Sequence, residues 1–223
     1  MKLARPLILA SSSPRRQYLM REVGFTFMAR VPDIDESFPE TMPVPDVPRY
    51  LAEKKARVFE SELQNEIVIA SDTVVVLNNT ILNKPVDRTD AVHMLTRLSG
   101  KTHTVITAVC ILAKEKLICF DDKTQVTFRS LSLKDIEYYI DTFKPLDKAG
   151  AYGAQDCLPE NFNPCSPQEL EFLNAIGKVS LIEQTITPPP AAGITIIDKI
   201  DGSYFTVMGL PIHLVYQHLI SFV

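Results

Sequence analysis

Short apolar runs alternate along this chain with segments whose apolar residues recur every three or four positions. The helical spacing predicts helices over residues 15–23, 48–59, 89–98, 133–142, 168–176 and 211–219. Runs rich in β-branched residues predict strands over residues 6–10, 25–31, 67–70, 74–77, 81–82, 102–113, 116–129, 194–197 and 204–207. Helices and strands mixed in this order favour an α/β fold with a mixed, partly antiparallel sheet.

Polar turns and prolines divide these elements. Lys114 and Glu115 join the two longest strands, and Asn78 and Asn79 form the turn of a shorter hairpin. Residues 157–192 break the pattern, because a polar stretch and an acidic, helix-like stretch are followed there by three consecutive prolines, which predict a stiff connector. We predict a single domain over residues 1–223 with an insertion at about 157–192.

Composition narrows the class of protein. A chain of 223 residues with 46% hydrophobic content can bury one substantial core. The net charge is −4 and no segment forms a basic run, which argues against non-specific binding to nucleic acid or to an anionic membrane. No apolar run approaches the roughly 20 residues that a membrane span needs, and the first run is too short for a signal peptide. We therefore expect a soluble, cytoplasmic protein.

The four cysteines do not form a recognisable framework. Cys110 and Cys119 fall in predicted strands and are interpreted as buried thiols, whereas Cys157 and Cys165 lie eight residues apart in a polar segment. No pair has C-x-x-C spacing. The sequence therefore predicts neither a zinc site nor a disulfide framework.

The first strand runs into a turn that is suited to bind phosphate. Ser11 and Ser13 offer hydroxyl and backbone donors, and Pro14 suits the first turn of a helix. A helix N-terminus attracts anions, and Arg15 and Arg16 add forked donors that match phosphate oxygens. The alternative is an ordinary serine-capped helix with two solvated arginines.

Acidic side chains gather at two other element ends. Asp35 and Glu36 could hold a hard cation, although a solvated acidic loop explains Asp35 equally well. Asp72 comes at the predicted carboxyl end of strand 67–70, where ligands of α/β sheets commonly bind. A capping or turn role for Asp72 is the competing interpretation.

Basic and amide side chains complete the set of candidate site residues. Of the adjacent Lys54 and Lys55, helical geometry places only Lys55 on the apolar side of its helix. Lys84 follows the short hairpin, and Gln155 follows a glycine-bearing turn and could contact a base edge. Phosphate binders, carboxylates and an amide together favour nucleotide phosphate chemistry, while the absence of G-x-x-x-x-G-K-[ST] disfavours a P-loop enzyme.

Six ordered motifs resemble the Maf family of nucleoside triphosphate pyrophosphatases. They are Ser11-x-Ser13-Pro14-Arg15-Arg16, Asp35-Glu36-Ser37, Glu53-x-Lys55-Ala56, Ser71-Asp72-Thr73-Val74-Val75, Lys84-Pro85 and Leu98-Ser99-Gly100-Lys101-Thr102-His103. The resemblance covers residues 7–155 almost continuously and resumes from Ile200 to Pro211. Residues 145–155 look like the branch that hydrolyses dTTP and UTP.

The resemblance implies a fold like that of inosine triphosphate pyrophosphatases, with an elongated mixed sheet flanked by helices and a cleft between two lobes. It also implies a role for each matching residue. Asp72 matches the proton acceptor; Arg15, Thr73 and Gln155 match the positions for substrate selectivity; and Glu36, Lys55 and Lys84 match residues lining the metal and triphosphate site. With the residue-level interpretation above, we expect Asp72, Lys55 and Lys84 to act in catalysis, Glu36 and Asp72 to bind the metal, and Ser11, Ser13 and Arg16 to bind phosphate. The implied reaction is attack of water at the α-phosphorus with Mg²⁺ or Mn²⁺, in a homodimer.

Two features depart from the family pattern. Asp156 places a negative charge after Gln155, where the family usually has glycine or a similarly permissive residue, and residues 157–192 replace a short loop. We predict that this segment is a lid or an interface element. Two other functions stay open. One is a nonenzymatic, division-associated nucleotide-binding protein. The other is a 7-methyl-GTP pyrophosphatase, which Thr73 and Gln155 disfavour and Asp156 leaves open.

Overall fold

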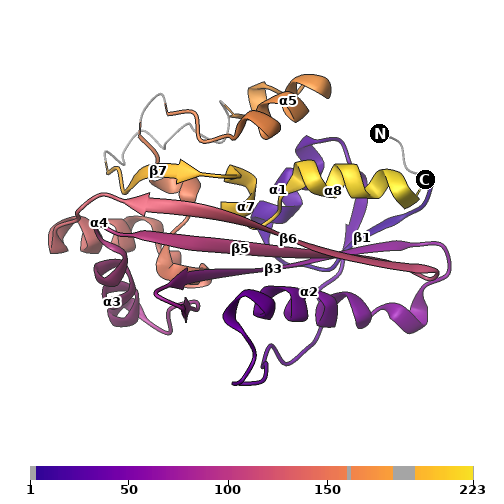
Figure 1. The fold of residues 1–223 in the computed structure, drawn as a ribbon, viewed down its shortest axis with the longest axis horizontal. Helices are drawn as coiled ribbons and strands as arrows, with labels where there is room; N and C mark the ends of the chain where they lie inside the picture. The colour runs from indigo at the N-terminus through magenta and orange to yellow at the C-terminus, as the bar shows by residue number, and fades with distance from the viewer. Residues whose placement is uncertain (1–3, 160–161, 183–193, 223) are drawn as a thin grey trace.

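Seven strands form one mixed sheet in the residues that the computed structural model describes, which are 4–159, 162–182 and 194–222 (Figure 1). The strands are β1 (Leu7–Leu9), β2 (Phe27–Ala29), β3 (Ile67–Leu77), β4 (Thr80–Leu82), β5 (Thr102–Ala113), β6 (Lys116–Phe128) and β7 (Ile197–Asp201). Their order is β2-β1-β3-β5-β6-β7, with β4 paired to β3. Strand β1 is parallel to β2 and β3, and the other pairs are antiparallel. The mixed sheet expected from the sequence is confirmed.

Helices cover both faces of this sheet. They are α1 (Pro14–Glu22), α2 (Val47–Arg57), α3 (Arg88–Leu98), α4 (Leu133–Phe143), α5 (Pro167–Ala175), α7 (Tyr204–Val207) and α8 (Ile212–Leu219). Short 3₁₀ turns are η1 (Val44–Asp46), η2 (Glu60–Glu62), η3 (Pro145–Asp147), η4 (Ala149–Ala151), η5 (Ala154–Asp156) and η6 (Ile220–Phe222). Figure 1 shows α2 on one side of the sheet and α1, α7 and α8 on the other.

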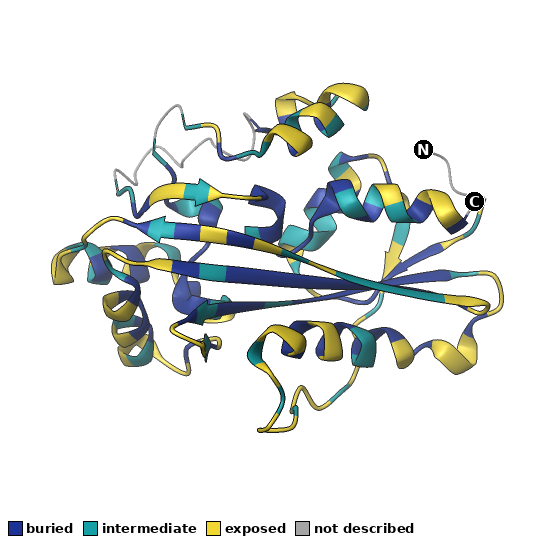
Figure 2. Ribbon diagram, viewed as in Figure 1, coloured by how far each residue is buried: buried dark blue, intermediate teal, exposed yellow. Residues whose placement is uncertain are grey.

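The alternation of side chains along β3 divides the core into two layers. Ile69 packs in the cluster that contains residues of α1, α3, α4 and α8, whereas Val68 packs with Ala52 and Ala56 of α2. Both β3 and β5 are buried along most of their length (Figure 2). Because successive residues of a strand point to opposite faces, Asp72 faces α2 and Thr73 faces the other layer.

Strand pairing along one edge of β3 is interrupted, and the candidate site lies at this gap. β1 pairs with β3 only as far as Ile69, and β4 pairs with it from Val75 onward. In the described part of the chain, residues 71–74 therefore have no strand neighbour on that edge. Both faces of the sheet can be reached through such an opening.

Strand β3 is longer than the sequence indicated. The apolar run was expected to end at Ala70, with Asp72 at the end of the strand, but β5 pairs with β3 without a break from Val68 to Val76. Because of this pairing, the strand continues through the polar residues Ser71, Asp72 and Thr73. Asp72 therefore lies in the middle of β3, although still just beyond the carboxyl end of the neighbouring β1.

Two further expectations near the C-terminal end need correction. Residues 204–207 form helix α7 and not a strand, because the Ser203 hydroxyl accepts a hydrogen bond from the Thr206 backbone N–H at 3.0 Å and caps a helical turn. The strand expected at 194–197 begins only at Ile197 and pairs with β6. In both cases the tertiary contacts outweigh the β-branched composition.

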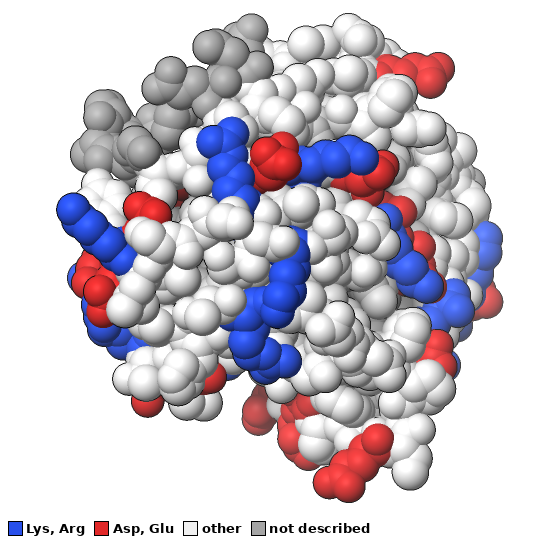
Figure 3. All heavy atoms as spheres, turned by 60° about the vertical axis from the view of Figure 1, so that its left-hand side comes forward, with Lys and Arg blue, Asp and Glu red and all other residues white. Residues whose placement is uncertain are grey.

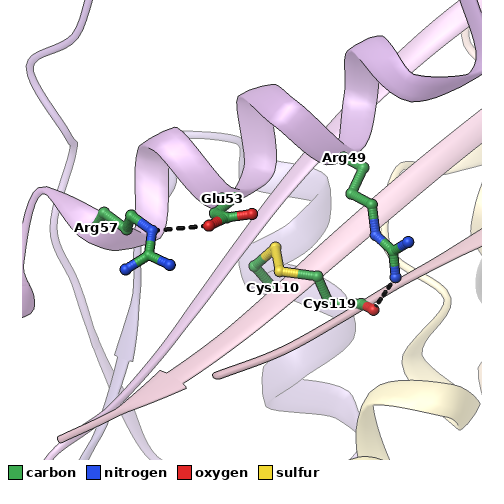
Figure 4. Close-up of a disulfide and its surroundings, with 5 residues drawn as sticks. All are labelled: Arg49, Glu53, Arg57, Cys110 and Cys119. Carbon is green, nitrogen blue, oxygen red and sulfur yellow. Dashed lines mark hydrogen bonds and ion pairs between the residues drawn. A yellow bond between two sulfur atoms is a disulfide. The ribbon is translucent and has the colours of Figure 1, made fainter. Parts of the chain in front are cut away.

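The expectation of two buried thiols at Cys110 and Cys119 is wrong, because these residues form a disulfide (Figure 4). They lie directly opposite each other on β5 and β6. The hairpin turn at 114–115 implies this pairing, since both cysteines are equally far from it. A search for C-x-x-C spacing cannot find a cross-strand pair. Figure 4 places the disulfide beside Arg49 and Glu53 of α2.

Helix α5 belongs to the segment that was predicted to be an insertion. It packs on α8, where Phe172 meets Tyr216 with ring centroids 5.3 Å apart. The three prolines at 188–190 lie outside the described residues. No described residue of segment 157–192 lines the cleft described below. Its role as a lid or an interface element stays a prediction.

The surface carries charges of both signs. On the face shown in Figure 3, basic and acidic side chains are interspersed among uncharged residues. Among the described residues, no helix has both the length and the apolar character that crossing a membrane requires.

Candidate active site

A cleft of about 650 Å³ lies at the interrupted edge of β3. Its walls come from the β1–α1 turn, α2, β3, the residues after β4, the turns η3 to η5, and the segment after α7. The ten residues that were assigned a role in the site all line it: Ser11, Ser13, Arg15, Arg16, Glu36, Lys55, Asp72, Thr73, Lys84 and Gln155. Side chains of both sheet faces therefore reach one cavity.

Lys55 joins two carboxylates on the α2 side of the cleft. Its Nζ lies 2.6 Å from Oδ1 of Asp72 and 2.9 Å from Oε1 of Glu36. Lys55 and Asp72 are buried, while Glu36 is half-exposed. As expected from helical spacing, Lys55 faces inward, whereas its neighbour Lys54 reaches the Ser37 carbonyl in an exposed contact.

Several cations act on Glu36. Burial raises the pKa of its carboxyl, but the hydrogen bond and charge of Lys55, together with the charges of Lys84 and Arg16, outweigh burial and leave the pKa below its usual value. Glu36 is therefore a carboxylate at neutral pH. Lys84 is exposed at the cleft after β4 and adds a positive charge there.

Asp35, the other half of the acidic pair, does not line the cleft. Its carboxylate accepts a hydrogen bond from the Ser37 backbone N–H at 2.9 Å and another from the Ser37 hydroxyl. These two hydrogen bonds lower the pKa of Asp35. The interpretation of Asp35 as a residue of an acidic loop fits this geometry.

The start of α1 keeps free donors toward the cleft. Ser13 is the N-cap, yet its side chain makes no capping hydrogen bond, and Pro14 occupies the first turn. The Ser11 hydroxyl instead accepts a hydrogen bond from the Ser13 backbone N–H at 3.1 Å. The backbone N–H groups of the first helical turn can therefore bind an anion, as expected for a phosphate cradle.

The two arginines of this turn have different surroundings. Arg15 is partly exposed, and its Nη1 lies 3.7 Å from Oδ2 of Asp147, so it remains able to contact a ligand. Arg16 is half-buried: its Nε donates to the Gly209 carbonyl at 2.8 Å and its Nη1 to the Ser71 carbonyl at 2.8 Å. Burial lowers the pKa of Arg16. Arg16 thus joins the β1–α1 turn to β3 and to the segment after α7.

Thr73 lies on the sheet face opposite to Asp72. Its hydroxyl accepts a hydrogen bond from Nη2 of Arg16 at 3.1 Å and lies 3.0 Å from the hydroxyl of Thr107, which is directly across the ladder on β5. Thr73 is half-buried and lines the cleft, whereas Thr107 is fully buried behind it.

Gln155 is held by a turn that depends on glycine. A Cβ on Gly153 would lie 2.5 Å from Oδ2 of Asp156 and 3.0 Å from Nε2 of Gln155, so a larger residue would displace these side chains. Oε1 of Gln155 is buried and has no hydrogen-bond partner among the described residues. Burial raises the pKa of Asp156, which does not line the cleft itself.

Sequence reasoning missed three residues of this site. Lys148 lines the cleft and donates to Asp147 at 2.7 Å, Gly209 supplies a carbonyl to Arg16, and Thr107 supports Thr73. Lys148 stands within the motif that drew attention to Gln155, so its charge was a usable signal. Thr107 carried none, because threonine is common in strands and only the β3–β5 register brings it to Thr73.

Comparisons with known proteins identify the family of this chain. The family model described as Maf-like protein matches residues 6–162. A dTTP/UTP pyrophosphatase of Flavobacterium psychrophilum is 40% identical over 216 residues, covering 96% of this chain and 93% of that protein. A dTTP/UTP pyrophosphatase of Bacteroides fragilis is 37% identical over 215 residues, covering 96% and 94%.

Two solved structures were also matched. The Ham1 protein of Staphylococcus aureus has a TM-score of 0.40 at 10% identity and covers 56% of this chain and 72% of that chain. A HAM1 protein of Coxiella burnetii has a TM-score of 0.42 at 17% identity, with 82% and 97% covered. The family match and the curated relatives extend over most of the sequence, and the chain belongs to the family of Maf-like proteins.

Proposed function

We propose that this chain hydrolyses dTTP and UTP to the nucleoside monophosphate and pyrophosphate. One observation supports the proposal most strongly. The buried pair Asp72 and Lys55 lines the same cleft as Glu36 and the start of α1, whose N-cap side chain makes no capping hydrogen bond. A base, a fixed cation and an anion cradle are the groups that hydrolysis of a phosphoanhydride needs. The names of the curated relatives support the choice of substrate.

Each group has a distinct task in the proposed reaction. Asp72 accepts the proton of the water that attacks the α-phosphorus, and Lys55 holds the carboxylate in position through Oδ1. The N–H groups at the start of α1, with Lys84 at the rim, bind the phosphate chain and the charge that develops on pyrophosphate. Arg15, Thr73 and Gln155 select the base.

The donor set fits a divalent cation that binds together with the nucleotide. Asp72 and Glu36 present hard oxygen donors to the cleft, and the described residues contain no cluster of three or more acidic, histidine or cysteine side chains that could hold a metal alone. Mg²⁺ characteristically binds through one or two carboxylates plus substrate phosphates. Such an ion, Mg²⁺ or Mn²⁺, would neutralise the phosphates and lower the pKa of a bound water.

The experiment is pyrophosphate release with magnesium over dTTP, UTP, CTP and 7-methyl-GTP, comparing the wild type with Asp72→Asn. We expect turnover of dTTP and UTP in the wild type and a loss of about 10²-fold or more in the variant. Asp198→Asn, the same change at an exposed carboxylate of β7, should leave turnover unchanged. Equal activity of wild type and Asp72→Asn contradicts the role of Asp72.

The same panel separates the competing functions. A nonenzymatic nucleotide-binding protein would bind dTTP or UTP without releasing pyrophosphate, and a 7-methyl-GTP pyrophosphatase would turn over that nucleotide instead. A homodimer and a cytoplasmic location are part of the proposal as well. Light scattering on the purified chain tests the first, and fractionation of cells that express the protein tests the second.

A further inference from the structure

A chain of hydrogen bonds runs from Arg16 through two threonines to helix α7. Nη2 of Arg16 lies 3.1 Å from the Thr73 hydroxyl, which lies 3.0 Å from the Thr107 hydroxyl. The Thr107 hydroxyl in turn donates to the Thr206 carbonyl at 2.7 Å. Thr107 and Thr206 are completely buried, so no water competes for these bonds.

The two ends of this chain fix the direction of its middle bond. A guanidinium can only donate, and a carbonyl can only accept. Thr107 has one hydroxyl proton, which it gives to Thr206, so it must accept the hydrogen bond that joins it to Thr73. Thr73 therefore uses its own proton on Thr107. Its oxygen has two acceptor positions, and Arg16 occupies one of them.

We infer that Thr73 meets the substrate as a hydrogen-bond acceptor, and that Thr107 and Arg16 are the positioning residues that impose this polarity. The inference rests on the proposed function, since Thr73 must face the base of a nucleotide. The group that it accepts from is an N–H on the base edge. Uracil and thymine carry such a donor at N3, whereas N3 of cytosine is an acceptor.

This polarity accounts for a choice between pyrimidines of nearly equal size. Cytosine at the same place would set two acceptors against each other, and Thr73 cannot turn its proton outward without breaking the bond to Thr107. Sites built to pair a specific substrate group reject analogues that lack it far more strongly than sites that read shape alone. Thr73 and Gln155 both line this cleft.

The test is the ratio of kcat/KM for UTP to that for CTP in Thr107→Val, Thr107→Ser and the wild type. Valine removes the acceptor for the Thr73 proton, which can then turn toward the cleft and donate to N3 of cytosine. We expect the ratio to fall about 10-fold or more in Thr107→Val and to be retained in Thr107→Ser. A purely structural role would lower both values together and leave the ratio unchanged.

Thr102→Val is the matched control, because Thr102 lies on the same strand and its hydroxyl bonds across the ladder to Thr127 at 2.8 Å on the exposed surface. It should retain the wild-type ratio. A wild type inactive on both dTTP and UTP refutes the proposed function. A wild type that prefers UTP, with an unchanged ratio in folded Thr107→Val, refutes only the inference about polarity.

A second measurement uses the wild type alone and so does not depend on the folding of a variant. Methylation of UTP at N3 removes the donor, whereas methylation at C5 leaves it in place and gives the base of dTTP. We expect the N3-methyl substrate to lose about 10²-fold or more in kcat/KM and the C5-methyl substrate to stay within a few-fold of UTP. Equal use of both methylated substrates overturns the inference.

Discussion

Lys55 is the residue on which the geometry of the candidate site depends. Its ammonium contacts Asp72 and Glu36 at once, although it is almost fully buried. Two carboxylates without a cation between them would repel each other in this partly buried place. Lys55 therefore keeps the proposed base and the proposed metal ligand at a fixed separation.

The substitution Lys55→Met tests this role with little change in side-chain length. We expect kcat/KM for UTP to fall about 10²-fold or more, and the acidic limb of the pH profile to move to higher pH, because the largest influence lowering the pKa of Glu36 is removed. The neighbouring Lys54→Met is the control and should keep wild-type activity and pH dependence. An unchanged pH profile in Lys55→Met would contradict the electrostatic coupling.

At the scale of residues, the sequence predicted which side chains line the cleft, but not all of their hydrogen-bond partners. The helical phase of residues 51–59 was enough to separate Lys55 from Lys54. The phosphate contact of Arg16 stays a prediction, and the structure shows its donors bound to Gly209, Ser71 and Thr73. Those partners come from distant segments, so no local pattern could indicate them.

At the scale of elements, the interruption between β1 and β4 creates the cleft. The order of strands and helices was predictable from the alternation of apolar and polar residues. The register was not, and for this reason the disulfide and the position of Asp72 within β3 escaped the sequence analysis. Short helices such as α7 also depend on contacts with residues far away in the chain.

Glu169 shows how helix α5 is tied to α7. Its buried carboxylate accepts hydrogen bonds from the Ser203 hydroxyl at 2.6 Å, from the Phe205 backbone N–H at 2.9 Å and from the Tyr204 backbone N–H at 3.1 Å. It also closes a capping box with Ser166. A single side chain thus caps both helices, and α7 leads into residues that line the cleft.

Glu169→Gln should lower the free energy of unfolding by about 2 to 3 kcal/mol, because an amide cannot accept all the bonds that the carboxylate accepts and leaves buried donors unpaired. Urea denaturation measures the change. The exposed Glu171→Gln, two residues along α5, should stay within about 0.5 kcal/mol of the wild type. Equal stability of the two variants would show that Glu169 does not anchor the segment.

At the scale of the whole molecule, buried histidines couple folding to pH. Burial lowers the pKa of His103 to about 4, and its Nε2 lies 2.8 Å from the Tyr152 hydroxyl. Burial also lowers the pKa of His213, against the opposing charges of Glu169 and Asp122. At both histidines the unfolded chain therefore binds more protons than the folded protein, and for His103 it does so between pH 6.5 and about 4.

The free energy of unfolding should accordingly rise with pH across this interval and level off above it. Each such histidine contributes a slope of at most about 1.4 kcal/mol per pH unit. Thermal or urea unfolding at a series of pH values checks the curve, with His103→Phe as the variant that removes one titration and the exposed His93→Gln as the control. An identical acid slope in wild type and His103→Phe would contradict the assignment to His103.

Hydrolysis of UTP in water enriched in ¹⁸O tests the central claim most directly, because it reports both the bond that breaks and the phosphorus that is attacked. Attack at the α-phosphorus predicts UMP carrying the label and unlabelled pyrophosphate, with magnesium present and Asp72 intact. Release of UDP and inorganic phosphate, label in the pyrophosphate, or no turnover of UTP and dTTP would contradict the proposed reaction.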